Sequence, residues 1–310
     1  MRYFRPYLCS LLLCLTGLAQ ADTSPFLQWF AQQYPEYLAQ GQADFGWRIY
    51  APAAGWQELP AELPVQPLAV LMQGLDDTGK VWMNLAPVLT ADGFAVLELR
   101  YPNDQAIHFS AEYLKQNLLE LQSRGATEFA LVTHSMGGLI ARDLLTAPDL
   151  AYLALSRSGQ APRCQRLIMV APPNHGSQLA HLRLASEIRE HAYKVWTGQG
   201  TLLGPFLDGQ GQAGKDLLPG SPFLKLLNQR RLPPELPVTI IAGLLNDDAP
   251  QLGDGAVSLE ATKLAEVSDF HVFTASHLFL IRNISPESNR VPPAVPLIRT
   301  LLQPLRPTTP

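Results

Sequence analysis

The sequence predicts an α/β fold in which a mostly parallel sheet is covered by helices on both faces. Short, continuously apolar segments of strand length alternate with amphipathic segments of helical spacing along most of the chain. Strands that are apolar at every position are typical of parallel sheets, because both faces of such a strand are buried. The alternation stops once, over residues 174–234, which we interpret as an insertion above the carboxyl edge of the sheet.

Apolar spacing and cap residues assign the elements in order. Ser24 and Pro25 indicate an opening helix, because they suit the N-cap and first position of one. Ser110 is suited to cap the helix of residues 111–123, and Gly125 to end it. The expected strands span residues 68–72, 94–99, 129–133, 167–170 and 238–242, with a sixth around 271–273; the other expected helices span residues 81–89, 139–145 and 297–302.

The N-terminus has the pattern of an export signal. Arg2 and Arg5 precede an apolar run, and residues 19–21 (AQA) match a signal-peptidase site. A helix of about 12–15 apolar residues rises about 18–23 Å, which is too short for a hydrocarbon core of about 30 Å. A retained membrane anchor is therefore the weaker alternative. We expect residues 1–21 to be a signal peptide and residues 22–310 to reach the periplasm or the exterior of the cell.

The composition argues against nucleic acid and metal ions as partners, and we expect no cofactor. The 310 residues include 23 Lys and Arg against 27 Asp and Glu, without a basic block, whereas phosphate binding needs clustered positive charge. Three cysteines are too few for a disulfide framework or a thiolate zinc site. The histidines of the insertion lack the spacing of metal ligands, and only a structural calcium ion is left open; these histidines are His175, His181 and His191.

Ser135 is the candidate nucleophile. It lies between the strand that ends at Thr133 and a following apolar helix, so it would occupy a sharp strand-to-helix turn with its hydroxyl exposed. Gly137 and Gly138 provide the small residues that a close approach of strand and helix requires. The N-terminus of that helix would point backbone N–H groups at a developing oxyanion. The alternative is an ordinary serine in a surface turn.

These residues resemble a known group of enzymes. The segment of residues 131–142, LVTHSMGGLIAR, resembles the nucleophile elbow of α/β-hydrolase-fold lipases and esterases. The chain departs from their G-x-S-x-G pattern at Thr133, which stands where the first glycine is usual. The resemblance implies an α/β-hydrolase fold over residues 22–310, with a cap or lid formed by the insertion.

The resemblance also implies an oxyanion hole. The segment LAVLMQGLDDTG, residues 68–79, resembles the loop that provides one of its donors, with Gln73 where a histidine is common. The donors would be the backbone N–H groups of Leu75 and Met136. Each such donor contributes on the order of 3 kcal/mol to the stability of the transition state. The alternative is an ordinary strand-to-helix turn.

His277 is the candidate general base. In this fold the base follows the last strand, and only His271 and His277 come after the fifth expected strand. His271 lies within the alternating segment of the sixth strand, which favours a position on the face of that strand. His277 follows the strand, where a loop could bring its ring to Ser135. His134 adjoins the nucleophile, and we expect it to be structural or to line the pocket.

Asp254 is the candidate acid that orients the base. Asp247, Asp248 and Asp254 all lie between the fifth strand and His277, in the chain order that this fold requires. The run Asp-Gly-Ala-Val that begins at Asp254 resembles the acid-bearing loop of bacterial lipases and of lecithin:cholesterol acyltransferase-like enzymes. Asp248 is the main alternative, because it lies closer to the end of the strand.

The insertion is the candidate cap. Segments 171–177 and 216–224 resemble parts of the same exported lipase-like enzymes, so the resemblance covers most of residues 68–280. Between these two segments, Leu203 and Phe206 belong to an apolar, glycine-flanked stretch. A cap with apolar residues suits the binding of an acyl chain, and glycines at its ends suit a lid. The alternative is that these side chains form the core of the cap itself.

The combined expectation is an exported serine hydrolase that cleaves carboxylic esters through Ser135, Asp254 and His277. Its partners would be an acyl ester or lipid and, transiently, a lipid surface. An acyltransferase or thioesterase would use the same residues, and an alcohol acceptor would reveal acyl transfer. A binding relative without activity is the third alternative. The oligomeric state is not indicated by the sequence.

Overall fold

An eight-stranded sheet forms the centre of the protein in the computed structural model, which describes residues 45–75, 80–177, 212–246, 250–283 and 290–305. All of these residues belong to one compact unit, residues 43–310. The strand order is β2-β1-β4-β3-β5-β6-β7-β8. The strands are β1 (Gly46–Ala51), β2 (Gly55–Glu58), β3 (Leu68–Met72), β4 (Ala95–Arg100), β5 (Glu128–His134), β6 (Arg163–Val170), β7 (Val238–Gly243) and β8 (Phe270–Phe273).

The mostly parallel sheet expected from the sequence is confirmed. The strands from β3 to β8 pair in parallel, and β1 pairs antiparallel with both β2 and β4 at one edge. The sequence analysis missed β1 and β2. Five of the six β1 residues are only half-buried, so this strand lacks the continuous apolar run that marks the central strands.

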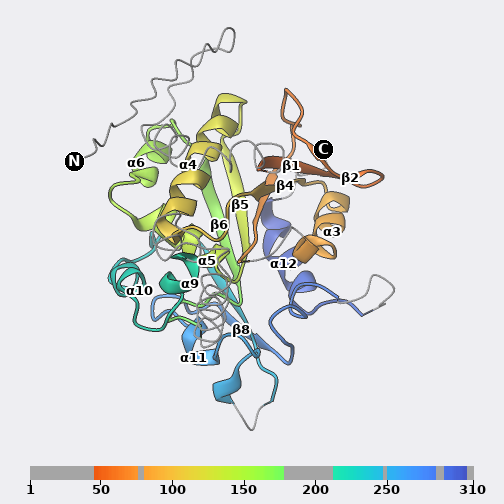
Figure 1. Ribbon diagram of the computed structural model, residues 1–310. Coiled ribbons are helices and arrows are strands. Elements are labelled where there is room, and N and C mark those ends of the chain that lie inside the picture. The colour runs from red at the N-terminus through yellow and green to blue at the C-terminus, as the bar shows by residue number, and fades with distance from the viewer. Residues whose placement is uncertain (1–44, 76–79, 178–211, 247–249, 284–289, 306–310) are drawn as a thin grey trace, which may run out of the picture. The chain divides into compact units, whose positions relative to one another are not determined.

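Helices cover both faces of the sheet, as Figure 1 shows. Alternate residues of β3 belong to different clusters: Val70 and Met72 pack with α4 and α5, whereas Ala69 and Leu71 pack with α3 and α12. This period of two is the geometry of a strand buried on both faces. The helices are α3 (Leu85–Ala91), α4 (Ile107–Ser123), α5 (Gly137–Thr146), α6 (Tyr152–Arg157), α9 (Gln212–Asp216), α10 (Pro222–Leu227), α11 (Leu259–Thr262) and α12 (Ala294–Leu302), with 3₁₀ turns η1 (Lys80–Trp82), η2 (Pro250–Leu252) and η3 (Gln303–Leu305).

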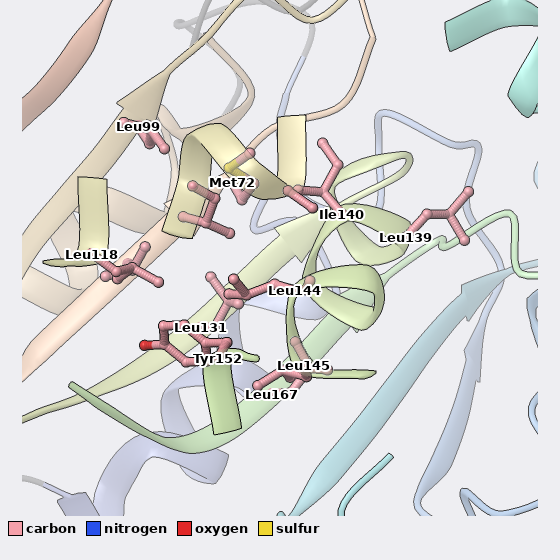
Figure 2. Packing of buried hydrophobic residues seen from close by; sticks show 14 of the residues in the cluster. Met72, Leu99, Leu118, Leu131, Leu139, Ile140, Leu144, Leu145, Tyr152 and Leu167 are labelled. Carbon is pink, nitrogen blue, oxygen red and sulfur yellow. The ribbon is translucent and has the colours of Figure 1, made fainter. Parts of the chain in front are cut away.

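The core beneath α4 and α5 joins side chains from several elements. Figure 2 shows Leu118 of α4 and Leu144 of α5 packed near Leu131 of β5. All three are fully buried. Burying a leucine side chain contributes about 1.5–3 kcal/mol, so this layer holds α5 firmly against the sheet.

One helix begins earlier than its expected cap. α4 starts at Ile107 rather than after Ser110, which is itself fully buried within the helix. The backbone N–H of Ile107 donates to Asp216 Oδ2 at 2.9 Å, so the first turn is capped by a carboxylate from α9. A cap supplied by a distant element leaves no local signal in the sequence. Gly125, with φ of +94°, follows α4 where a helix stop was expected.

Two expectations fall partly or wholly outside the described residues. The signal peptide and the opening helix lie within residues 1–44. Of the expected insertion, the structure describes residues 174–177 and 212–234, which include α9 and α10. No helix among the described residues is long and apolar enough to span a membrane.

Candidate active site

Ser135 occupies the turn between β5 and α5 in a left-handed backbone conformation, with φ of +54°. Such a conformation is unfavourable for a residue with a side chain, so the surrounding contacts must hold it. The Ser135 N–H donates to the Val170 carbonyl of β6 at 2.8 Å. A strained serine between a strand and a helix is the geometry of a nucleophile elbow.

The two glycines after the nucleophile allow the helix to approach the sheet. A Cβ at Gly137 would lie 2.8 Å from the Gln73 carbonyl oxygen, and one at Gly138 would lie 2.9 Å from the Pro172 Cβ. Both distances are shorter than real Cβ contacts. Thr133 stands where the elbow pattern usually has its first glycine. Its side chain is fully buried, and its hydroxyl donates to the Ile168 carbonyl at 3.4 Å.

His277 and Asp254 are in direct contact. Asp254 follows β7 and His277 follows β8, and Nδ1 of the histidine lies 2.8 Å from Oδ2 of the carboxylate. A carboxylate only accepts hydrogen bonds, so Nδ1 carries the proton and Nε2 of the neutral ring is free of one. The His277 side chain is 18 % exposed, whereas that of Asp254 is fully buried.

The local sequence orients the Asp254 carboxylate. Oδ1 accepts from the N–H groups of Ala256 at 2.9 Å and Val257 at 2.8 Å, which leaves Oδ2 for the histidine. Gly255 has φ of +92°, a conformation that favours glycine, and permits this tight turn. The Asp-Gly-Ala-Val run thus explains why the carboxylate points toward His277.

His134, at the end of β5, contacts the candidate base His277. Its ring centroid lies 4.7 Å from that of His277, and its Nε2 donates to the His277 main-chain carbonyl at 3.1 Å. Burial, and then the neighbouring His277, lower the pKa of His134 to about 3. The ring is therefore neutral near pH 7. These contacts place the His277 ring against His134, the residue that directly precedes Ser135.

The loop after β3 lies against Ser135. A Cβ at Gly74 would lie 2.8 Å from the Ser135 Cβ and 3.2 Å from the backbone nitrogen of Met136. The structure thus brings the segment that contains Leu75 beside the first residue after the nucleophile. Met136 is fully buried, and Leu75 is partly buried and packs against the core.

The alternatives raised by the sequence lie elsewhere or outside the described residues. His271 is on β8, as expected, and its Nε2 contacts Asp269 Oδ1 at 2.8 Å. Asp247 and Asp248 lie outside the described residues, as do Leu203 and Phe206 of the insertion. In the described part of the chain, no three His, Cys, Asp or Glu side chains gather as metal ligands.

A buried polar cluster beneath the site was missed by the sequence analysis. Arg142 of α5 is 1 % exposed, and its guanidinium donates to Asn174 Oδ1 at 3.0 Å and Asn228 Oδ1 at 2.9 Å. Burial lowers its pKa to about 10. Asn174 in turn donates to the Thr262 carbonyl of α11 at 2.7 Å. An arginine within the apolar run GLIARDLL was the available signal.

Solved structures of low sequence identity share this fold. The mature form of Bacillus licheniformis lipase BlEst2 is 17 % identical, with 84 % of this chain and 97 % of that chain covered at a TM-score of 0.53. Staphylococcus hyicus lipase is 13 % identical, with 80 % and 98 % covered and a TM-score of 0.54. The phospholipase PlaB from Legionella pneumophila is 20 % identical at a TM-score of 0.52, with 75 % of this chain and 58 % of that chain covered. This chain therefore spans little more than half the length of that phospholipase.

Sequence comparison adds no relative. No protein-family model matches the chain, and no curated protein matches its sequence. The assignment therefore rests on architecture: the sheet order, the helices on both faces and the structural likeness to bacterial lipases. At these identities the likeness establishes the fold alone. The chain has the α/β-hydrolase fold.

Proposed function

We propose that this protein is an exported serine hydrolase that cleaves carboxylic esters, with Ser135 as nucleophile, His277 as general base and Asp254 as the acid that orients it. The observation that carries the proposal is the 2.8 Å contact of His277 with a fully buried Asp254 carboxylate, next to a strained serine. A hydrogen-bonded histidine and carboxylate beside such a serine are the parts that acyl transfer requires.

In the first step Ser135 Oγ attacks the ester carbonyl carbon and His277 Nε2 accepts the hydroxyl proton. The resulting imidazolium is stabilised by the Asp254 carboxylate, whose desolvated position strengthens the interaction. The hydrogen bond to Nδ1 also keeps the ring in the tautomer that leaves Nε2 able to accept.

The oxyanion formed by this attack would be held by the N–H groups of Leu75 and Met136. Support comes from the close packing of Gly74 against Ser135 and the Met136 nitrogen. The proton on His277 then passes to the leaving alkoxide, which departs as the alcohol. Water attacks the remaining acyl-enzyme, with His277 acting as base again, and releases the carboxylic acid and the free serine.

We further propose that the substrate contains an acyl chain or lipid, that residues 174–234 form a cap, and that residues 1–21 direct export. The names of the structural neighbours, two lipases and a phospholipase, support the substrate class. Leu203 and Phe206 are proposed to contact the acyl chain. The enzyme would contact a lipid surface only transiently.

Labelling with a fluorophosphonate probe tests the nucleophile. The wild-type protein should be labelled at Ser135, and Ser135→Ala should abolish both labelling and hydrolysis of p-nitrophenyl butyrate. Ser123→Ala is a matched control, because this exposed serine also lies in an S-x-G string but ends a helix. Labelling that persists in Ser135→Ala would refute the proposal.

A series of p-nitrophenyl esters tests the substrate class. Each CH₂ buried by the enzyme contributes about 0.8 kcal/mol, so kcat/KM should rise about three- to fourfold per added CH₂ until the pocket is full. Leu203→Asp or Phe206→Asp should flatten this rise and leave acetate hydrolysis largely intact. Acetate as the best substrate would instead indicate an esterase for small esters.

A further inference from the structure

Two consecutive carbonyls of the loop after β3 are held by side chains from the segment after β4. The Tyr101 hydroxyl donates to the Gln73 carbonyl at 2.7 Å, and Asn103 Nδ2 donates to the Gly74 carbonyl at 3.2 Å. Neither side chain is among the residues assigned to the reaction. Both act on the peptide units that lead to Leu75.

The direction of the second hydrogen bond has a geometric consequence. The peptide bond between Gly74 and Leu75 is trans, as are all peptide bonds of the described residues, so its C=O and N–H point in opposite directions. In the sheet, β3 lies between β4 and β5. A Gly74 carbonyl held on the β4 side by Asn103 therefore turns the Leu75 N–H toward the β5 side, where Ser135 lies.

The packing at Gly74 places the peptide unit between Gly74 and Leu75 next to Ser135. A Cβ at Gly74 would lie 2.8 Å from the Ser135 Cβ and 3.2 Å from the Met136 nitrogen. The peptide unit that begins at this Cα therefore borders the space in which an oxyanion on Ser135 would form. An oxyanion-hole donor acts only when it is aimed at that position before the reaction.

We infer that Asn103 is a positioning residue of the oxyanion hole, which aims the Leu75 N–H at the reacting carbonyl oxygen by holding the Gly74 carbonyl. The inference rests on the proposed ester hydrolysis. Asn103 would act on the reaction through the peptide unit between Gly74 and Leu75, whose carbonyl it holds. Tyr101 anchors the preceding carbonyl, but it is 3 % exposed and part of the core, so its replacement would also disturb packing.

Asn103→Leu and Asn103→Asp test the inference, because both remove the N–H donor while keeping a side chain of similar size. Loss of one oxyanion-hole donor lowers kcat by about 10²–10³-fold. In the Asn103 variants the Leu75 N–H is still present but no longer aimed, so kcat should fall by about 10- to 100-fold. KM for p-nitrophenyl butyrate should stay within about twofold of the wild-type value. The affinity for an arylboronic acid, whose tetrahedral adduct with serine carries a negative oxygen, should fall in parallel with kcat.

Asn117→Leu is the matched control. Asn117 Nδ2 donates to the Tyr113 carbonyl at 2.9 Å in α4, so the same change removes an amide-to-carbonyl bond of the same kind away from the site. This variant should keep kcat, KM and boronate affinity within about twofold of wild type. Thermal unfolding of all the variants should give melting temperatures close to wild type.

If the wild-type protein is an active esterase, either of two results would overturn the inference. One is an Asn103→Leu variant with kcat within about twofold of wild type. The other is a fall in kcat without a matching loss of boronate affinity, which a merely structural role would produce. A wild-type protein that neither cleaves the ester nor binds the boronate would overturn the proposed function together with this inference.

Discussion

Three hydrogen bonds, two with Asp254 and one with His134, hold His277 in place. Its main-chain N–H donates to the Asp254 carbonyl at 2.9 Å, its Nδ1 donates to the Asp254 carboxylate, and its main-chain carbonyl accepts from His134. These hydrogen bonds fix both the backbone and the ring of the proposed base. At the scale of single residues, the site therefore depends on the identity of Asp254 as an acceptor.

Asp254→Asn should lower kcat by about 10³–10⁴-fold. An amide there can donate to Nδ1, which favours the tautomer whose Nε2 already carries a proton and cannot accept one from Ser135. Ser135→Ala and His277→Ala should each cost about 10⁴–10⁶-fold, because such residues act as a unit. Steady-state hydrolysis of p-nitrophenyl butyrate measures all three effects.

Asp269→Asn is the control for this prediction. Asp269 also contacts a histidine, His271, at 2.8 Å, but on β8 rather than beside the nucleophile, and its replacement should leave kcat within about twofold. A severe defect in Asp248→Asn combined with a mild one in Asp254→Asn would show that the acid was assigned wrongly.

At the scale of elements, α5 follows the proposed nucleophile Ser135 and is buried along almost its whole length. Arg142 on this helix is joined to Asn174 after β6 and to Asn228 after α10, and Asn174 is joined to α11. Three segments are thus connected to one helix through hydrogen bonds that are buried at Arg142 and Asn174 and reach the surface at Asn228. Such a network is strong only while every member is satisfied.

Arg142→Met should lower the free energy of unfolding by about 1–3 kcal/mol. The methionine fills much of the volume, but it leaves the fully buried Asn174 amide oxygen without its donor, whereas water can replace the donor to Asn228, which is exposed. Urea unfolding followed by circular dichroism measures the change.

Arg163→Met serves as the comparison for Arg142. The Arg163 side chain is 63 % exposed and pairs with Glu128 at the surface, where an ion pair contributes about 0–1 kcal/mol. We expect its replacement to change stability by less than about 0.5 kcal/mol. Equal losses in the two variants would show that the buried network does not stabilise the fold.

At the scale of the whole molecule, His134 couples folding to pH. Its pKa is about 3 in the folded protein and about 6.5 in an unfolded chain, because burial disfavours the charged ring. Between these two values the unfolded chain binds a proton that the folded chain does not. The contribution of His134 is therefore fully present above about pH 6.5 and is lost progressively as the pH falls toward 3.

His134→Gln should reduce this dependence on pH. In the wild type the free energy of unfolding should fall by up to about 1.4 kcal/mol per pH unit on account of His134 within this window. The glutamine keeps an N–H donor for the His277 carbonyl but does not titrate. Urea unfolding at pH 7, 6 and 5 should give a steeper slope for the wild type than for the variant, and parallel slopes would contradict the assignment.

Local pattern was sufficient for most of the fold. Each of the six expected strands is present. Five were marked by continuous apolar runs, because a strand buried on both faces is apolar at successive positions. The sixth, β8, is a half-buried edge strand and was marked by the alternating segment around His271. The start of α4 was misplaced because its cap is Asp216, more than a hundred residues away. The strand β1 was missed because half-buried positions carry no continuous apolar run.

The sequence by itself determined the order and type of the central elements and the candidates Ser135, Asp254 and His277, because chain order and short motifs constrain these. Only the tertiary structure decided which side chains meet. The contact of His277 with Asp254, the packing of His134 on His277 and the hold of Asn103 on Gly74 all join separate segments. Parallel strands bring their carboxyl ends to one edge of the sheet, and the contacts made there depend on loop geometry that no local pattern specifies.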